Sequence, residues 1–269
     1  MAERMVGVYF ETLFGINLTQ VLLAFTRISG FIFTAPLFQS KNISPPLKVC
    51  FAFGLALIIA PFITAELDLM KFNFAMSCVS LLVELLVGLI IGFVANLMFA
   101  GLQLAGYYFD LTLGFGMVNI FDPTSGSEMP LFGQFNNILA LLVFLAINGH
   151  HLLLRALIES YQVIPPGKFL LQAGAVQLIV QVFIKMFLLG FQVGMPLLGS
   201  IFLVDAALGI IAKLLPQLNV FVIGFPIKIA LGLLILIAFL PLYLMMVETV
   251  FGNSGETYRS LRLLMRQMH

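Results

Sequence analysis

The sequence predicts an all-α protein of the integral-membrane class. Hydrophobic residues make up 61% of its 269 residues, charged residues make up only 9%, and the mean hydropathy is +1.12. So few polar side chains cannot cover a soluble globule, whose surface carries many charged groups. Long apolar stretches separated by short polar connections indicate helices that cross or line a membrane.

The apolar stretches are about as long as membrane-spanning helices, or longer. A helix that rises 1.5 Å per residue needs about 20 residues to cross the hydrocarbon core of a bilayer. We therefore expect six hydrophobic helical segments. They are Leu13–Phe38, Val49–Ala65, Ala75–Phe109, Leu131–Leu154, Phe169–Val204 and Ile229–Val247.

Two of these stretches are too long for one straight span. As unbroken helices, Ala75–Phe109 and Phe169–Val204 would each be roughly 50 Å long, whereas the hydrocarbon core is about 30 Å thick. We expect them to bend, to break or to extend beyond the lipid. In the second stretch Pro196 lies among three glycines, which predicts a kink or a turn that divides the stretch into two shorter helices.

The C-terminal segment ETYRSLRLLMRQMH predicts an amphipathic helix. Arg259, Arg262 and Arg266 are spaced by three and four residues, so they share one helical face. Apolar side chains lie largely on the opposite face. Such a helix is typical of a membrane surface or of a contact with a partner protein. The apolar residues are Leu261, Leu264, Met265 and Met268.

Seven charged residues lie within the apolar stretches or at their edges, where an unpaired charge costs several kcal/mol. One interpretation is an ion or proton pathway. The other is pairing between helices, or charged heads that reach the interface, and we favour it because most of these residues lie near segment ends. The residues are Arg27, Glu84, Asp110, Arg155, Lys185, Asp205 and Glu248.

Glu84, Gly88 and Gly92 recur at every fourth position and therefore share one helical face. Glycines at this spacing let two helices approach closely. We expect this face to contact another helix, either in the same chain or in another subunit. We assign Glu84, Gly88, Gly92, Asp110 and Arg155 to helix packing and assembly.

Nothing in the sequence indicates an enzyme. The H-E-x-x-H, G-x-S-x-G, G-x-x-x-x-G-K-[ST] and G-x-G-x-x-G motifs are absent, so we expect no catalytic residue, cofactor or metal site. His150 and His151 diverge by about 100° on a helix, and we expect His150 to hydrogen-bond within packed helices. Cys50 and Cys78 lack a redox or metal motif and predict free, buried thiols. A net charge of +1 indicates no nucleic-acid partner.

The segment FDPTSGSEMPLFGQF, residues 121–135, is polar and rich in turn-forming residues. The pair Asp122-Pro123 disfavours a helix, and Ser125-Gly126 continues the turn. Irregular backbone at membrane depth is tolerated only where it is buried in protein or lines a water-filled cavity.

Four apolar residues precede this turn, and apolar constrictions gate pores by excluding water. From the residues alone, a pore gate and an ordinary solvent loop are equally good interpretations. The four are Phe115, Met117, Ile120 and Phe121.

An ordered set of motifs along nearly the whole chain closely resembles the FliR family, the flagellar type III export-gate subunits related to SctT of injectisomes. The central motifs follow one another in the family's order and spacing. Further matches lie toward both ends of the chain. The matching elements are Arg27; Glu84 with Gly88 and Gly92; Gly114 and Gly116; Asp122-Pro123, Ser125-Gly126 and Pro130; Asn148-Gly149-His150; Ser160-Tyr161; Pro165-Pro166-Gly167; and PQLNVFVIGFPIKI, residues 216–229.

The resemblance implies a non-enzymatic subunit that forms, with FliP and FliQ homologues, a channel for unfolded flagellar proteins. It implies a place in the bacterial inner membrane at the flagellar basal body, with FlhB and FlhA homologues as further partners and membrane lipid around the assembly. The rival hypothesis from the residues is a stand-alone secondary transporter with coupling charges at Glu84, Asp110, Arg155 or Asp205.

The resemblance also implies long helical hairpins in a multi-subunit helical assembly. Residues 1–165 would form a FliP-like half that includes the polar loop, and residues 166–269 a FliQ-like half with the basic tail. The loop would project into the pore as a plug. By resemblance, the plug residues are Gly114, Phe115, Gly116, Met117, Ile120, Phe121, Asp122 and Pro123.

Overall fold

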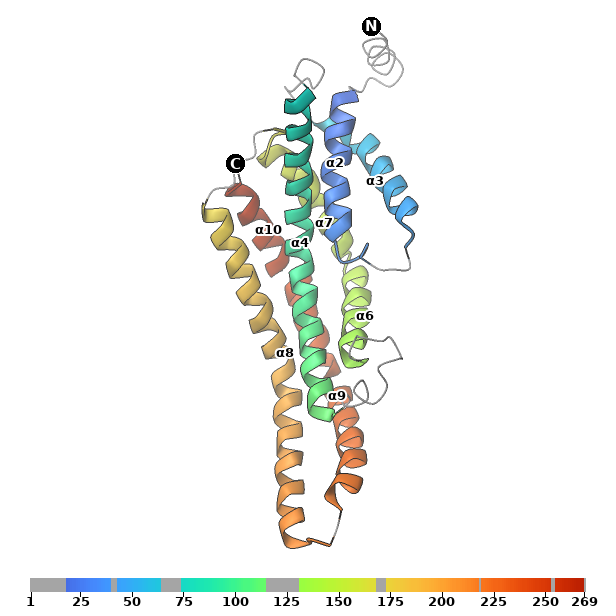
Figure 1. The fold of residues 1–269 in the computed structure, drawn as a ribbon, viewed down its shortest axis with the longest axis vertical. Coiled ribbons are helices and arrows are strands. Elements are labelled where there is room, and N and C mark those ends of the chain that lie inside the picture. The colour runs from blue at the N-terminus through green and yellow to red at the C-terminus, as the bar shows by residue number, and fades with distance from the viewer. Residues whose placement is uncertain are drawn as a thin grey trace. The chain divides into compact units, whose positions relative to one another are not determined.

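The structure is a computed structural model that describes residues 18–39, 43–63, 74–114, 131–167, 173–217, 219–252 and 255–268. These residues form α-helices and one short 3-10 helix, with no strand among them (Figure 1). The predicted all-α class is therefore confirmed.

The chain divides into two compact units. The first unit consists of Met1–Asn96, His150–Val182 and Glu256–His269, and the second of Leu97–Gly149 and Phe183–Gly255. Each unit draws on both predicted halves. The predicted halves, 1–165 and 166–269, are defined by similarity to FliP and FliQ and not by contacts within the chain. The two units therefore do not test them, and the halves stay a prediction.

The described helices of the first unit come from distant parts of the chain, and two long helices continue into the second unit. The first unit holds α2 (Leu18–Thr34), α3 (Pro45–Ile59), η1 (Ala60–Phe62), the first part of α4 (Phe74–Leu113), α7 (Gly149–Val163), the start of α8 (Ala173–Leu214) and α10 (Glu256–Arg266). The second unit holds the rest of α4 and α8, with α6 (Leu131–Ala146) and α9 (Val220–Phe251).

Helices α2 and α4 touch backbone to backbone in the first unit. A Cβ atom added at Gly88 would collide with the carbonyl oxygen of Arg27 and lie 2.9 Å from the Phe31 nitrogen. One added at Gly92 would lie 2.7 Å from the Phe31 oxygen, and Gly30 on α2 is equally crowded by α4. The face that carries Gly88 and Gly92 thus packs against a helix of the same chain.

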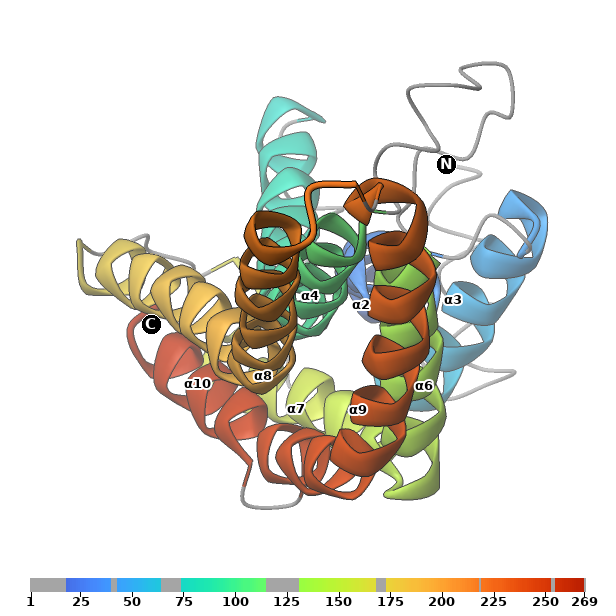
Figure 2. The ribbon, with the colours of Figure 1, turned by 90° about the horizontal axis from the view of Figure 1, so that it is seen from below.

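Aromatic rings and one hydrogen bond join α6 and α9 in the second unit, where the two helices lie side by side (Figure 2). The rings of Phe144 and Phe251 meet edge to face at 5.4 Å, and both contact the ring of Phe99 on α4. Tyr243 donates a hydrogen bond of 3.0 Å to the carbonyl oxygen of Asn136. The rings of Phe99, Phe144 and Phe251 thus form an aromatic cluster in the core of this unit.

Of the kink or turn predicted near Pro196, the turn is wrong, because α8 runs unbroken from Ala173 to Leu214 with Pro196 inside. A proline in a helix removes one backbone hydrogen bond. A turn would instead leave several backbone groups unpaired in apolar surroundings, which costs more. Helix α9 likewise contains Pro226 and Pro241.

Two other predicted boundaries also shift. The stretch predicted as one segment, Leu131–Leu154, is interrupted between α6 and α7, where Asn148 adopts the left-handed backbone conformation with φ 58°. The last stretch begins at Val220 rather than at Ile229, because Pro226 is accommodated inside α9.

Several described helices are long and apolar enough to cross a membrane. Four runs meet this condition, and a fifth does if α6 and α7 count as one span. In the most apolar windows of Ala173–Leu214 and Val222–Gln267, only 11% and 17% of the residues are buried inside the chain. The apolar outer faces of α8 and α9 therefore need lipid or other protein around them.

The cysteines are free as predicted, but the prediction that they are buried is wrong. Cys50 is exposed and Cys78 is partly exposed. Helix α3 buries the face with Ala52, Ala56 and Ile59, and Cys50 lies on the opposite side of the helix.

Replacement of Gly88 by leucine should separate α2 from α4. We expect Gly88→Leu to lower the free energy of unfolding by about 3 kcal/mol or more, because the added side chain meets backbone that cannot move aside. Thermal unfolding of the full chain in detergent measures this effect. Gly54→Leu is the matched control, since nothing lies within 4 Å of a Cβ at Gly54. Equal losses in both variants would contradict the close contact.

Candidate functional site

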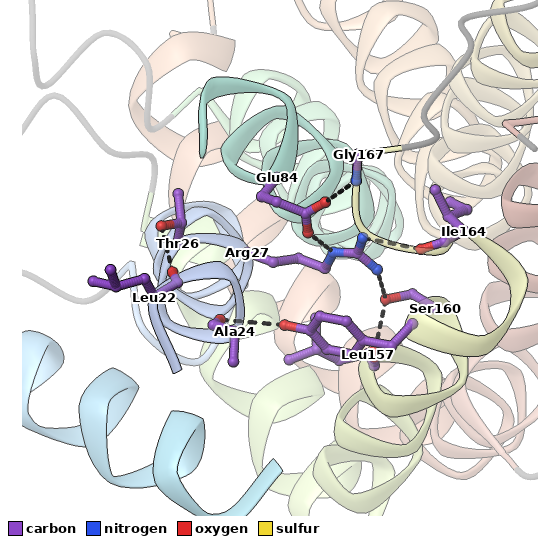
Figure 3. A network of polar contacts seen from close by, with 10 residues as sticks. Leu22, Ala24, Thr26, Arg27, Glu84, Leu157, Ser160, Ile164 and Gly167 are labelled. Atoms are coloured by element: carbon purple, nitrogen blue, oxygen red, sulfur yellow. Dashed lines mark hydrogen bonds and ion pairs between the residues drawn. The ribbon is translucent and has the colours of Figure 1, made fainter. Parts of the chain in front are cut away.

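A buried ion pair between α2 and α4 forms the centre of the first unit (Figure 3). The guanidinium of Arg27 is wholly buried, and its Nε donates to Oε2 of Glu84 at 2.6 Å. Glu84 is also fully buried. For these two residues the predicted pairing of charges between helices is therefore confirmed.

The other donors of Arg27 reach α7 and the turn that follows it. Nη1 donates to Oγ of Ser160 at 3.1 Å, and Nη2 donates to the carbonyl oxygen of Ile164 at 3.0 Å. The guanidinium carbon lies 4.2 Å from the ring centre of Tyr161. Each guanidinium nitrogen thus has a partner, as a buried charge requires.

The second oxygen of Glu84 accepts a hydrogen bond of 3.2 Å from the backbone N–H of Gly167. Gly167 ends the described part of the Pro165-Pro166-Gly167 turn and has φ 78°, a conformation that favours glycine. The ion pair therefore links α2, α4, α7 and this turn into one cluster, which we call the Arg27 cluster.

A second carboxylate of α4, Asp110, holds the start of α6 in the second unit. Its Oδ2 accepts hydrogen bonds from the backbone N–H groups of Phe132 at 2.8 Å and Gly133 at 3.1 Å. The first N–H groups of a helix have no partner within the helix, and a carboxylate is favoured there. Asp110 thus acts as an N-terminal cap supplied by another helix.

A glycine one turn away allows this approach. A Cβ atom at Gly106 would lie only 2.7 Å from the backbone of Gly133. The rings of Phe109 and Phe132 meet edge to face at 4.7 Å beside the cap. Together these contacts hold the end of α4 against the start of α6, and we call them the Asp110 clamp.

Only one predicted plug residue, Gly114, is described. It ends α4 with φ 86°, and the ring of Phe225 would lie 3.3 Å from a Cβ placed there. The structure therefore shows where the segment leaves α4, after Leu113, and where it enters α6, at Leu131. The others, Phe115, Gly116, Met117, Ile120, Phe121, Asp122 and Pro123, lie outside the described residues.

The remaining predicted charges are more exposed. The Arg155 side chain is 71% exposed and pairs with Glu159 on the same helix at 3.2 Å. Asp205 and Lys228 pair at 2.8 Å between α8 and α9. Neither Arg155 nor Asp205 joins the two buried clusters, and the predicted assembly role of Arg155 stays a prediction.

The expected hydrogen bond of His150 is not formed by its Nδ1, which is buried without a partner in the described part of the chain. The ring of His150 lies 4.2 Å from the ring of His151, because both belong to the first turn of α7. No group of three or more His, Cys, Asp and Glu side chains suited to a metal occurs among the described residues.

Sequence reasoning missed the partners of the ion pair. Ser160, Ile164 and Gly167 take part through one hydroxyl and two backbone groups, which leave little trace in a sequence. Ser160 and Gly167 belong to the matched motifs, and that was the only signal that could have found them.

Loss of one partner of the buried pair should be costly. We expect Arg27→Met to lower the free energy of unfolding in detergent by about 3–5 kcal/mol, because it leaves the Glu84 charge buried without its counter-ion. The double variant Arg27→Met with Glu84→Leu should recover much of this loss. Arg155→Met is the control, and loss of this exposed pair should cost under about 1 kcal/mol. A double variant no better than the single one would argue against the pairing.

Removal of the Asp110 cap should loosen the start of α6. We expect Asp110→Ala to destabilise the fold by about 1–2 kcal/mol and to speed hydrogen exchange at the amides of Phe132 and Gly133. Asp110→Asn keeps one acceptor oxygen and should have a smaller effect. The control is Asp205→Ala, which removes an exposed charge. Unchanged exchange at both amides in Asp110→Ala would refute the cap.

The chain is similar over most of its length to flagellar proteins. It is 40% identical over 250 residues to the flagellar biosynthetic protein FliR of Bacillus subtilis, an alignment that covers 90% of this chain and 94% of that protein. It is 31% identical over 242 residues to FliR of Aquifex aeolicus, covering 90% and 93%, and 30% identical over 227 residues to FliR of Escherichia coli, covering 84% and 86%.

Residues 18–254 match the family described as bacterial export proteins, family 1. This match includes the Arg27 cluster, the Asp110 clamp and the segment between α4 and α6. The resemblance to FliR proteins is thereby confirmed, and the chain belongs to the family of bacterial export proteins, family 1.

Proposed function

We propose that this chain is a non-enzymatic subunit of the flagellar protein export gate and that it forms the export channel with FliP and FliQ homologues. Its membership in the family of bacterial export proteins and its similarity to FliR proteins support a role in flagellar protein export. In this proposal the gate lies in the bacterial inner membrane at the flagellar basal body. Unfolded flagellar proteins are its substrates, and FlhB and FlhA homologues are further partners.

The segment Gly114–Pro130 is the plug of the channel in this proposal. The observation that supports it best is the Asp110 clamp, which fixes the two points where the segment leaves α4 and enters α6. A segment that must seal a pore needs fixed ends, because a mobile base would leave a gap around it. Its polar, turn-forming sequence and its apolar flank at Phe115, Met117, Ile120 and Phe121 also fit this role.

The exposed apolar faces support assembly into a larger complex. Phe202 is 71% exposed and Phe225 is 42% exposed, on helices that are largely unburied within the chain. Such faces are covered by lipid or by neighbouring subunits. The proposed assembly places FliP-like and FliQ-like helices on part of them, in line with the proposed halves of the chain.

A secondary transporter is the rival function, because intramembrane charges are functional candidates. Two of the four proposed coupling residues, Glu84 and Asp205, are paired with Arg27 and Lys228, and Arg155 is exposed. Of the four, Asp110 alone has a described side-chain atom, Oδ1, that is buried without a hydrogen-bond partner among the described residues. Coupled solute uptake by the purified chain, reconstituted without partner proteins, would favour the rival.

Deletion of the plug should make the assembled gate leak. We expect cells that express the complete complex with residues 115–121 deleted to lose ion tightness, measured as a fall in membrane potential. An equally long deletion of residues 64–70, in another connection, is the matched control and should leave the potential unchanged. An assembled complex that stays tight without residues 115–121 would refute the plug.

A scaffold without a conducting role is the remaining possibility. A photo-crosslinker at position 117 tests it, since a chain in transit should be captured there only if this segment faces the export path.

A further inference from the structure

The first unit carries a basic surface that the proposed function does not use. Its arginines come from α10 and from α7, two helices that contact each other through Glu159. Four arginines and two glutamates occupy this surface, which leaves a net charge of +2. The residues are Arg155, Arg259, Arg262, Arg266, Glu159 and Glu256.

Glu159 already has three side-chain partners within the chain. Nε of Arg155 and the hydroxyl of Tyr258 donate hydrogen bonds to its carboxylate at 3.2 Å and 2.9 Å, and Nε of Arg262 forms an ion pair with it at 3.6 Å. One carboxylate thus gathers two arginines and neutralises only one of them. Arg155 is 71% exposed and Arg262 is 54% exposed, so both retain donors that face outward.

Arg259 and Arg266 are exposed and have no ion-pair partner among the described residues. They lie two helical turns apart on the face of α10 that also carries Arg262. Leu261, Leu264, Met265 and Met268 hold the opposite face of α10 in the core of the unit. The predicted amphipathic helix is therefore confirmed, and its arginines are displayed on a fixed surface.

The chemistry of this surface favours a phosphate-bearing ligand. Guanidinium groups match phosphate oxygens with paired hydrogen bonds. An interface with another protein usually has an apolar centre. The exposed face of α10 has instead one partly exposed leucine, Leu263 at 46%, among its arginines.

This helix closely follows an apolar span in the sequence. Only four residues, 252–255, separate Phe251, where α9 ends, from Glu256, where α10 begins. A basic helix beside the end of a span meets the headgroup layer, where arginines attract anionic lipids and a leucine can enter the acyl boundary. We propose that the α7–α10 surface binds the headgroups of anionic phospholipids.

The test measures lipid preference of the purified full-length chain in neutral detergent. Phosphatidylglycerol or phosphatidylcholine is added, and bound lipid is counted by native mass spectrometry. We expect wild type to prefer phosphatidylglycerol, and Arg259→Gln with Arg266→Gln to lower this preference by roughly 25-fold, about fivefold per arginine. Both side chains lack partners in the described chain, so the variant should unfold at the wild-type temperature.

Lys48→Gln with Lys213→Gln is the control, since it removes the same charge from helices α3 and α8. An equal loss in the control, or an unchanged preference in the arginine variant, would overturn the proposal. So would displacement of the lipid by an equal concentration of inorganic phosphate, which would assign the site to a free anion. The surface would be assigned to a protein partner if the wild-type chain shows no lipid preference and if binding of an acidic protein requires these arginines.

This inference does not depend on the export role. Lipid counting needs neither FliP and FliQ homologues nor a conducting channel. If the gate stays tight after deletion of the plug, the lipid result still stands. If no lipid preference is found, the proposed plug is likewise unaffected.

Discussion

The buried charge of Arg27 imposes the strictest condition on the first unit. A guanidinium removed from water needs a counter-ion and a partner for each of its nitrogens, or the fold loses several kcal/mol. Glu84 on α4, and Ser160 and the carbonyl of Ile164 on α7 and the turn after it, meet this condition from two separate parts of the chain. The condition can be met only because Gly88 brings α4 against the backbone of α2. The position of α7 and its following turn depends on the same pair.

Helix α4 combines a carboxylate and a glycine, four residues apart, in each unit. In the first unit a carboxylate precedes a glycine by four residues, Glu84 and Gly88, and in the second a glycine precedes a carboxylate by four, Gly106 and Asp110. In both, the glycine admits a neighbouring backbone and the carboxylate accepts backbone N–H groups at a connection between helices. Such contacts fix connections in apolar surroundings, where no water replaces a missing partner.

The sequence predicted the helices and the glycine face well, because both depend on local pattern. Apolar stretches form helices where the backbone must make all its hydrogen bonds within the segment. The four-residue spacing of Gly88 and Gly92 places both on one face of a helix. It could not predict which charges pair, since Arg27 and Glu84 meet through tertiary packing. The turn that it allowed at Pro196 is wrong, because the local tendency to break a helix is weaker than the need of the surrounding backbone for hydrogen bonds. The hydroxyl and carbonyl partners of Arg27 have no pattern that a sequence reveals.

The lengths of α4 and α8 connect the fold to the proposed gate. With 40 and 42 residues, they are about 60 Å long, twice the thickness of the hydrocarbon core. Tilt shortens this excess only in part, because tilts of membrane helices rarely exceed about 40°. The apolar residues outside the lipid must then be covered by protein, and little of α8 is covered by its own chain. Neighbouring subunits with equally long helices would meet this need, which favours the proposed gate over a lone transporter chain.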